Sequence, residues 1–305
     1  MNIFVAGATG AVGLPLVRAL CARGHEVTGT TRTGSGADAL REVGANVCVL
    51  DAFNRVEVID AVAAAAPDVM IDQLTWLPAN PADIVKSLPN DTRLHKEGGD
   101  NLLAAAEAAG VARYILQSRG FFLDAPFGKL ADETARLRYT APGPIGENTR
   151  VIGAYEDRVL DSTVFQGVVL RYGFFYGPGT WYRPEGAIAQ QFRRGEARII
   201  GDGQGVWSFV HIDDAISATV AAVTADPGTY NIVDDNPLPV SKWMPAFARW
   251  IGAPVPAQLS IEDAVSMSGE EAVFYHMQLT GASNIRAKEN LGFRPRDLLW
   301  AREGL

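Results

Sequence analysis

“NIFVAGATGAVG”, residues 2–13, joins a short apolar run to a glycine-rich turn, and a helical pattern follows at once in “LPLVRALCARG”. Gly7, Gly10 and Gly13 lie in the turn. A turn that leads from a strand into a helix presents free backbone N–H groups and a favourable dipole to a phosphate, and glycine lets the backbone approach closely. The spacing is GxxGxxG and departs from the GxGxxG fingerprint. We expect a pyrophosphate-binding turn, and a glycine turn without a ligand is the alternative.

Short apolar runs alternate with helical runs through the first part of the chain. After the first strand, strands are expected at 26–32, 46–51, 68–74, 113–118 and 167–173, and a later helix is expected over 150–165. Such alternation predicts an α/β protein with a parallel sheet covered on both faces. We therefore expect a Rossmann-type doubly wound sheet, in which ligands bind at the carboxyl ends of the strands.

The composition narrows the class of partner. A net charge of −8 disfavours nucleic acid, because phosphate contacts need clustered Lys and Arg. Cys21 and Cys48 have no metal-ligand spacing, so no metal site is predicted and a reducing compartment is favoured. The apolar stretch 58–77 is interrupted by Asp60, Pro67 and Asp72, and no leader pattern precedes the first strand. We expect a cytoplasmic protein that does not bind a membrane.

The end of the second expected strand indicates which dinucleotide would bind. An acidic residue there would hold a ribose 2′-hydroxyl, whereas an Arg accommodates a 2′-phosphate. The sequence reads “GTTRTGSG” at 29–36, with Arg32 among small hydroxyl residues and no acid before Asp38. The forked donors of Arg suit a phosphate. We favour NADP(H) over NAD(H), and a solvated loop residue is the alternative for Arg32.

With these motifs in order, the chain resembles the extended short-chain dehydrogenase/reductase superfamily, often called NAD-dependent epimerases/dehydratases. The resemblance covers nearly the whole chain. It is carried by “GATGAVG” (7–13), “NLLAAAEAAGVARYILQS” (101–118), “LRYGFFYGPG” (170–179), “GDGQGVWSFVHIDDA” (201–215), “YNIVDDNPLPV” (230–240) and “AKENLGFRP” (287–295).

The resemblance implies one unit over 1–305, with a cofactor-binding core of about 1–172 plus 206–234. A smaller C-terminal substrate-binding cap would comprise about 173–205 and 235–305. Family members often dimerise through two helices, which here would include 100–109 and 150–162, so a homodimer stays open as an alternative to a monomer.

The resemblance also implies where the cofactor lies. Asp51 and Ala52 would lie near the adenine, Gln73–Thr75 along the cofactor and Tyr172–Phe174 near the nicotinamide. The expected cofactor-binding residues are Gly7, Ala8, Thr9, Gly10, Ala11, Val12, Gly13, Thr31, Arg32, Asp51, Ala52, Gln73, Leu74, Thr75, Gln117, Tyr172, Gly173 and Phe174.

The usual chemistry of the family needs a Tyr and, four residues later, a Lys on one helix face, with a Ser or Thr after the fifth strand. Here Asn148 stands where the Tyr is expected and Ile152 where the Lys is expected. The position after the fifth strand is Arg119, with Ser118 just before it. Because neither Asn nor Ile transfers a proton, the chain departs from the usual mechanism.

Tyr155 is the nearest substitute, about two helical turns from position 148. Its plus-four residue is Val159, although Arg158 at plus three shares its face and could stabilise a phenolate. In the alternative that we favour, the helix is amphipathic and turns Tyr155 and Val159 inward. Its charged residues Glu156, Asp157 and Arg158 would then point outward. The candidates for catalysis are Arg119, Ser118, Tyr176 and Tyr155.

Aromatic residues dominate the expected substrate pocket, which favours an apolar or planar small molecule over a sugar. Trp207 stands where nucleotide-sugar-binding relatives have an Arg that contacts the diphosphate. Arg183, Arg193 and Arg194 could bind an anion but are more simply a solvated helix end. The substrate candidates are Phe121, Phe122, Phe175, Trp181 and Trp207.

His211 has a second interpretation besides catalysis, because His is common at that family position. Asp213 and Asp214 directly precede a helix, where Asp caps free N–H groups. We expect structural roles for all three residues.

Three functions compete. The leading hypothesis is an atypical NADP(H)-dependent oxidoreductase that reduces a carbonyl or activated double bond of a small, largely apolar or aromatic substrate. The first alternative is a sugar epimerase or dehydratase, against which the missing Tyr/Lys pair and Trp207 both argue. The second alternative is a non-catalytic regulator that senses NADP(H) and binds a partner protein.

Overall fold

A parallel seven-stranded sheet forms the centre of the computed structural model, which describes residues 1–126 and 128–301. Its strands run in the order β11-β6-β5-β4-β1-β2-β3, and all neighbouring pairs are parallel. Their bounds are β1 Asn2–Ala6, β2 Glu26–Thr31, β3 Asn46–Val49, β4 Val69–Asp72, β5 Arg113–Arg119, β6 Gln166–Tyr172 and β11 Gly228–Ile232. The predicted Rossmann-type fold is confirmed.

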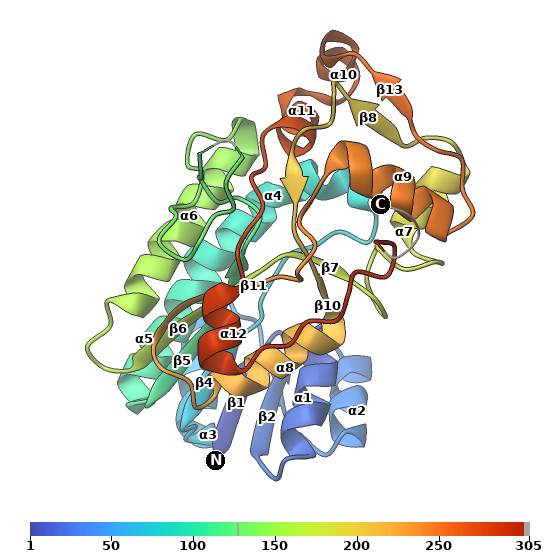
Figure 1. Ribbon diagram of the computed structural model, residues 1–305. Coiled ribbons are helices and arrows are strands. Elements are labelled where there is room, and N and C mark those ends of the chain that lie inside the picture. The colour runs from blue at the N-terminus through green and yellow to red at the C-terminus, as the bar shows by residue number, and fades with distance from the viewer. Residues whose placement is uncertain (127, 302–305) are drawn as a thin grey trace.

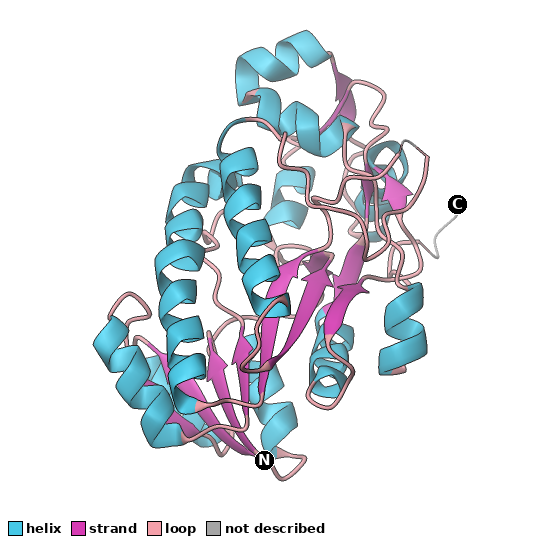
Figure 2. Cartoon of the chain, turned by 90° about the vertical axis from the view of Figure 1, so that its left-hand side faces the viewer, coloured by secondary structure: helices cyan, strands magenta, loops and turns pink. Residues whose placement is uncertain are grey.

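Helices cover both faces of the sheet (Figures 1 and 2). One apolar cluster joins the sheet to α1 (Gly13–Cys21), α2 (Gly34–Glu42), α8 (Ile212–Ala222) and α12 (Ile285–Leu291). A second cluster joins it to α3 (Arg55–Ala65), α5 (Gly99–Ala109) and α6 (Gly143–Leu160). The strands are near-continuous apolar runs because side chains on both faces are buried, as expected for a parallel sheet.

An unbroken helical stretch leads into the second of these layers. It comprises a short 3₁₀ turn (Pro81–Asp83), α4 (Ile84–Arg93), a π-helical turn (Leu94–Gly98) and α5. No helix among residues 1–126 and 128–301 is long and apolar enough to cross a membrane.

The remaining elements form a smaller layer above the carboxyl ends of the strands. It contains three two-stranded sheets, β10-β7, β12-β9 and β13-β8. Their strands are β7 Phe174–Tyr176, β8 Arg198–Ile200, β9 Val206–Trp207, β10 Phe209–His211, β12 Leu238–Pro239 and β13 Ala257–Leu259. The helices are α7 Ala187–Arg193, α9 Val240–Trp250, α10 Ile261–Ser268 and α11 Glu270–Met277.

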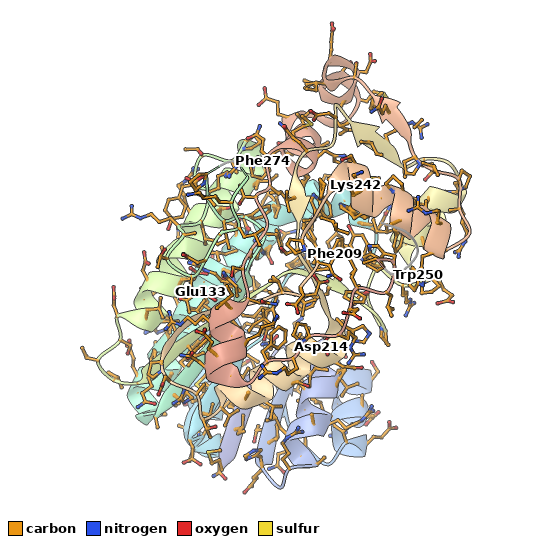
Figure 3. All side chains as sticks on the ribbon, in the orientation of Figure 1. Glu133, Phe209, Asp214, Lys242, Trp250 and Phe274 are labelled. Atoms are coloured by element: carbon orange, nitrogen blue, oxygen red, sulfur yellow. The ribbon has the colours of Figure 1, made fainter. Side chains whose placement is uncertain are left out.

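This layer has an aromatic core of its own. Phe209, Trp243, Phe247 and Trp300 are buried in it and meet mostly edge to face. Figure 3 shows Phe209 and Trp250 on this side of the molecule. The limits of core and cap stay a prediction, and the last four residues of the range 235–305 lie outside the described part of the chain.

Helix α6 begins seven residues earlier than the 150–165 predicted from the sequence. Pro142 precedes it in an extended conformation, and Pro144 occupies its first turn, where no backbone N–H is needed. The helix ends at Leu160, and Ser162 then accepts the N–H groups of Val164 and Phe165 before β6 starts. The prediction of the helix was correct in kind, but both of its boundaries were wrong.

Glu156 was predicted to point outward, and this was wrong. Its side chain is buried and accepts the hydroxyl of Ser118 at 2.5 Å and the guanidinium of Arg171 at 2.6 and 3.0 Å. Arg171 also donates to the carbonyl of Ala135 at 2.9 Å. The sheet and the loop after β5 both cover α6, so two sides of the helix are buried, and the Arg171 charge makes a buried carboxylate tolerable.

Glu156→Ala should lower the free energy of unfolding by about 3–5 kcal/mol, because it leaves the buried Arg171 charge without a partner. Urea unfolding measures this. The neighbouring exposed residue supplies the control, since Asp157→Ala should change stability by no more than about 0.5 kcal/mol. Equal losses in the two variants would contradict the assignment.

Candidate cofactor and active site

A cavity of about 250 Å³ opens at the carboxyl ends of the central strands. Strands β1 and β4 are neighbours there, and the chain leaves them on opposite sides, which is the place where doubly wound sheets bind ligands. The cavity is lined by Gly7, Thr9, Gly10, Thr30, Thr31, Arg32, Leu50, Asp51, Ala52, Phe53, Gln73, Leu74, Thr75, Trp76 and Leu94.

The structure brings together most of the expected cofactor residues in this lining. Ala8, Ala11, Val12 and Gly13 are not among the lining residues. Neither are the residues expected near the nicotinamide, namely Gln117, Tyr172, Gly173 and Phe174. Sequence reasoning missed Thr30, Leu50, Phe53, Trp76 and Leu94. The last four are apolar or aromatic wall residues, which follow no motif.

The three glycines of the turn are subject to different steric constraints. A Cβ on Gly7, whose φ is +75°, would lie 2.6 Å from the backbone oxygen of Gln73, and one on Gly13 would lie 2.1 Å from that of Gly7. These two positions are required by the chain's own packing. Within 4 Å, a Cβ on Gly10 would meet only the oxygen of Gly7, at 3.4 Å, so Gly10 alone leaves open space on the cavity side.

Arg32 and Trp76 form one wall of the cavity. The Arg32 guanidinium carbon lies 5.2 Å from the centroid of the Trp76 ring. Nearby, the Thr33 hydroxyl accepts the N–H of Gly36 at 3.1 Å and caps α2. The one acidic residue in the lining, Asp51, follows β3 and accepts the N–H of Phe53 at 3.0 Å.

Gln73 shows that the cavity suits a polar ligand. The residue is 5% exposed, and its amide oxygen and nitrogen make no hydrogen bond of good geometry in the described chain, although the amide lies near enough to the Tyr172 hydroxyl to lower the pKa of that phenol. A buried amide without partners is costly, and such groups usually mark a ligand, ion or water. A dinucleotide with both donors and acceptors fits this wall.

Arg119 is the last residue of β5 and lies in a buried polar cluster. Its guanidinium donates to the carboxylate of Asp91 and to the side-chain oxygen of Asn148. The Asn148 amide donates in turn to Asp91 and to Thr92, both at 3.0 Å. At the position predicted to correspond to the family's Tyr, the chain therefore has an amide held against an ion pair.

Asp91 is the centre of this cluster. Burial raises the pKa of its carboxyl, but the charges of Arg119 and His95 and the N–H of Trp76 outweigh burial and hold that pKa well below its usual range. The Nε2 atom of His95 lies 3.5 Å from Oδ2 of Asp91. Sequence reasoning missed both residues, although their spacing of four on a helical stretch marks a shared face.

Tyr155 packs inside the protein and does not line the cavity. Its hydroxyl donates to Asp72 at 2.7 Å and lies 2.6 Å from the hydroxyl of Tyr114. Burial and the neighbouring Asp72 charge raise the pKa of Tyr155 well above its usual value. Arg158 is half exposed and pairs with Asp100, so it makes no bond to this phenol. This geometry disfavours the catalytic interpretation.

The hydroxyls of Ser118, Tyr176 and Tyr172 are also inside the protein. Ser118 is bonded to Glu156, and burial raises the pKa of Tyr176, whose hydroxyl has no partner in the described chain. The Tyr172 hydroxyl lies 2.6 Å from that of Thr219, and burial raises its pKa to about 12. Only Arg119 among the catalytic candidates reaches the polar cluster.

Aromatic rings stack at the carboxyl ends of β5 and β6. Phe174 is sandwiched between Phe121, with centroids 4.3 Å apart, and Trp207, with centroids 4.0 Å apart. Tyr275 of α11 lies beside this stack, and its carbonyl accepts the indole N–H of Trp207 at 2.8 Å. We call Phe121, Phe174, Trp207 and Tyr275 the aromatic wall.

The other substrate candidates are placed differently. Phe122 is buried next to Phe121, Phe175 packs against Tyr172 in the sheet cluster, and Trp181 packs on the aromatic core of the upper layer. Sequence reasoning grouped these residues because several lie on loops at the carboxyl ends of strands, but neighbouring strand residues such as Phe174 and Phe175 point to opposite sides.

His211 caps α8, because its Nδ1 accepts the N–H of Asp213 at 3.1 Å. The carboxylate of Asp214, which Figure 3 places on α8, accepts the Arg296 side chain at 3.0 Å instead. The prediction that the two Asp residues cap the helix was wrong in this respect. Arg193 donates to the carbonyls of Pro184 and Ile251, and Arg194 pairs with Glu196 at the surface.

Residues 3–233 match the NAD dependent epimerase/dehydratase family. The chain belongs to this family. It is 40% identical over 309 residues to a 3-diazoavenalumate denitrifying reductase from Streptomyces sp, covering 100% of this chain and 99% of that one. It is 28% identical to a 2-alkyl-3-oxoalkanoate reductase from Stenotrophomonas maltophilia, over 83% of this chain and 77% of that one.

Solved structures with the same fold include UDP-glucose 4-epimerase from Thermotoga maritima, with a TM-score of 0.76 and 22% identity over 98% of this chain and 95% of that one. The Thermus thermophilus UDP-glucose 4-epimerase has a TM-score of 0.73 and 24% identity, over 97% and 94% of the two chains. The family resemblance is confirmed, and the protein is an NAD(P)-dependent enzyme.

Gly10→Ala should weaken NADPH binding by about tenfold or more, which is ~1.4 kcal/mol, because the new methyl group enters the cavity. Its unfolding temperature should stay near that of the wild type. Gly13→Ala is the matched control and should lower the free energy of unfolding by about 1–3 kcal/mol through overpacking. Fluorescence titration and thermal unfolding separate the two effects, and a Gly10→Ala protein that binds NADPH normally would refute this division of roles.

Proposed function

We propose that the protein is an NADP(H)-dependent reductase that delivers a hydride to a small planar aromatic substrate. The observation that carries the proposal is the arrangement of polar and aromatic side chains in the site. Asn148, at the position predicted for the family's Tyr, is held against the Arg119–Asp91 ion pair, and the aromatic wall lies at the carboxyl ends of β5 and β6. Gly10, Gln73 and Arg32 would hold the cofactor, which supplies a hydride when bound.

The polar cluster is poorly suited to donating a proton. Asp91 stays ionised because its pKa is held well below the usual range, Asn148 has no ionisable group, and His95 is buried against Asp91. A carbonyl that accepts a hydride becomes an alkoxide and needs a proton. An arenediazonium that accepts a hydride releases dinitrogen, forms the neutral arene and needs no proton. The site favours the second type of substrate.

The comparison with the Streptomyces reductase supports the same substrate class. Its name specifies a diazo-substituted substrate and a denitrifying reduction, and its similarity spans this whole chain. We therefore propose an aromatic diazonium compound as the first candidate substrate. Phe174 is covered on both faces, so the partly exposed Phe121 and Tyr275 would offer the ring surface for a planar substrate and also for a cation, since aromatic faces attract positive charge.

Reduction of a ketone is the second candidate. The Stenotrophomonas reductase, whose name specifies an oxoalkanoate, supports it. Tyr275 of the aromatic wall is only half-buried and could offer its hydroxyl to a substrate oxygen, although burial raises its pKa while the Arg119 charge opposes that shift. Trp207 and the missing Tyr/Lys pair weigh against the sugar epimerase, and membership of an enzyme family weighs against the regulator.

Two simple probes test this proposal. With a benzenediazonium salt, the enzyme should release dinitrogen in step with NADPH oxidation, and deuterium from C4-labelled NADPH should enter the product while deuterium from D2O should not. The enzymatic rate should change by less than about twofold between about pH 6 and about pH 9, because no titrating donor takes part. Enzyme-free NADPH is the control.

Turnover of benzaldehyde with a pH-dependent rate, and none of the diazonium salt, would replace the first candidate by the second. Failure to accelerate either probe over the enzyme-free control would contradict both candidates.

Arg32 should determine the preference for NADP(H). Arg32→Asp should weaken NADPH binding by about ten- to a hundredfold, the value of a lost charge-assisted hydrogen bond, and leave NADH binding unchanged or improved. Dissociation constants for both cofactors measure the ratio. Arg41→Ala on the exposed face of α2 is the control, and an unchanged ratio in Arg32→Asp would sink the NADP(H) assignment.

A further inference from the structure

We propose that Asp91 is a positioning residue that joins the wall of the cofactor cavity to Arg119. Its two carboxylate oxygens have different partners. Oδ1 accepts the backbone N–H of Trp76 at 2.8 Å, whereas Oδ2 accepts Arg119 and the amide of Asn148. One side chain thus fixes both the segment that lines the cavity and the charged group at the end of β5.

On the cofactor side, Asp91 acts through the backbone of Trp76. Trp76 lines the cavity, and its ring lies against the guanidinium of Arg32. The segment before it runs from β4 and carries Gln73, whose amide is unpartnered, and Leu74, whose N–H is held by Asp72 at 2.9 Å. Asp72 and Asp91 therefore fix the two ends of the stretch that the cofactor would contact.

On the chemical side, Asp91 holds Arg119 and Asn148 together. Asn148 bonds to Arg119 through its oxygen and to Asp91 through its nitrogen, so the three side chains form a closed ring of contacts. Thr92 accepts the second N–H of Asn148 and fixes the orientation of the amide. Arg119 consequently has little freedom to move unless Asp91 moves with it.

The helical stretch of Asp91 also reaches the cavity directly. Asp91 lies in the last turn of α4, and the π-helical turn that follows places Leu94 in the cavity lining and His95 against Asp91. π-Helical turns are rare and often occur at functional sites. The whole arrangement lets a cofactor that presses on Trp76 and Leu94 bias the position of Arg119.

A purely structural role is the competing explanation, and the chain contains an example of one. Glu156 also forms a buried ion pair, with Arg171, but the other hydrogen-bond partners of this pair, Ser118, Glu133 and Ala135, do not line the cavity as Trp76 does. A structural carboxylate should affect stability alone. A positioning carboxylate should also change cofactor affinity and turnover, and should do so separately through its two oxygens.

Three variants separate these roles. Asp91→Asn keeps an oxygen for the Trp76 N–H but removes the charge that holds Arg119, so NADPH affinity should stay within about threefold while turnover of the benzenediazonium probe falls by about tenfold or more. Asp91→Ala should weaken NADPH binding and should also lower turnover of the probe. Glu156→Gln is the control and should leave the NADPH dissociation constant unchanged.

The coupling to Arg119 is measured by a double-mutant cycle. If Asp91 acts on turnover through Arg119, Asp91→Asn should cost little further turnover in an Arg119→Met background. If the losses in kcat of the two single variants instead multiply in the double variant, the two residues act independently, and this half of the proposal is overturned. Should the Asp91 variants not fold, Asn148→Ala replaces them, and a normal kcat in that variant would overturn it equally.

The cofactor half does not rest on the proposed function, although the turnover half does. Tryptophan fluorescence with NADPH measures affinity without any substrate. An Asp91→Ala protein that binds NADPH as well as the wild type would overturn the link to Trp76. A wild type that binds NADPH but turns over neither benzenediazonium nor benzaldehyde would instead contradict the proposed function and leave the link to Trp76 intact.

Discussion

The parallel direction of the seven strands is the constraint on which the site depends, because it brings the carboxyl ends of all of them to one edge of the sheet. Strand β1 delivers Gly7 there, β4 delivers Gln73, and β5 delivers Arg119. The turn after β1 adds a steric condition. Helix α1 starts so close to the strand that a Cβ on Gly13 would lie 2.1 Å from the oxygen of Gly7. The shape of the glycine turn therefore follows from packing that the fold needs in any case.

The polar cluster around Asp91 is built on fixed charge. A carboxylate as buried as Asp91 is tolerated only when its charge is paired and its oxygens are hydrogen-bonded, and Arg119, Asn148 and the Trp76 N–H meet both conditions. The resulting group is rigid and close to neutral. Apart from His95, which is buried against Asp91, it contains no side chain suited to donating a proton, and this favours the proposed reduction that needs none.

Two other buried carboxylates, Asp72 and Glu156, are also bonded to polar or charged side chains, and their role is structural. Asp72 accepts a hydrogen bond from the hydroxyl of Tyr155. Glu156 accepts one from the hydroxyl of Ser118 and forms an ion pair with Arg171. These hydroxyls belong to residues that the sequence presents as candidates for catalysis. What separates them from the Asp91 cluster is exposure, since the Arg119 side chain of that cluster is 14% exposed whereas all five of these residues are less than a tenth exposed. Chemical type alone does not distinguish a structural Tyr or Ser from a catalytic one.

From the sequence alone, the alternating periodicity predicted the sheet, the glycine turn predicted the cofactor edge, and the absence of Tyr and Lys at 148 and 152 predicted an unusual site. These signals are local, because a strand, a turn or a helix face is defined by neighbours in the chain. Asp91, Trp76 and Tyr275 come from three separate segments, and no short-range pattern connects them. Only the tertiary structure decided that Asp91 meets Arg119 and that Glu156 turns inward, because both depend on which charges two distant segments bring to the same buried place.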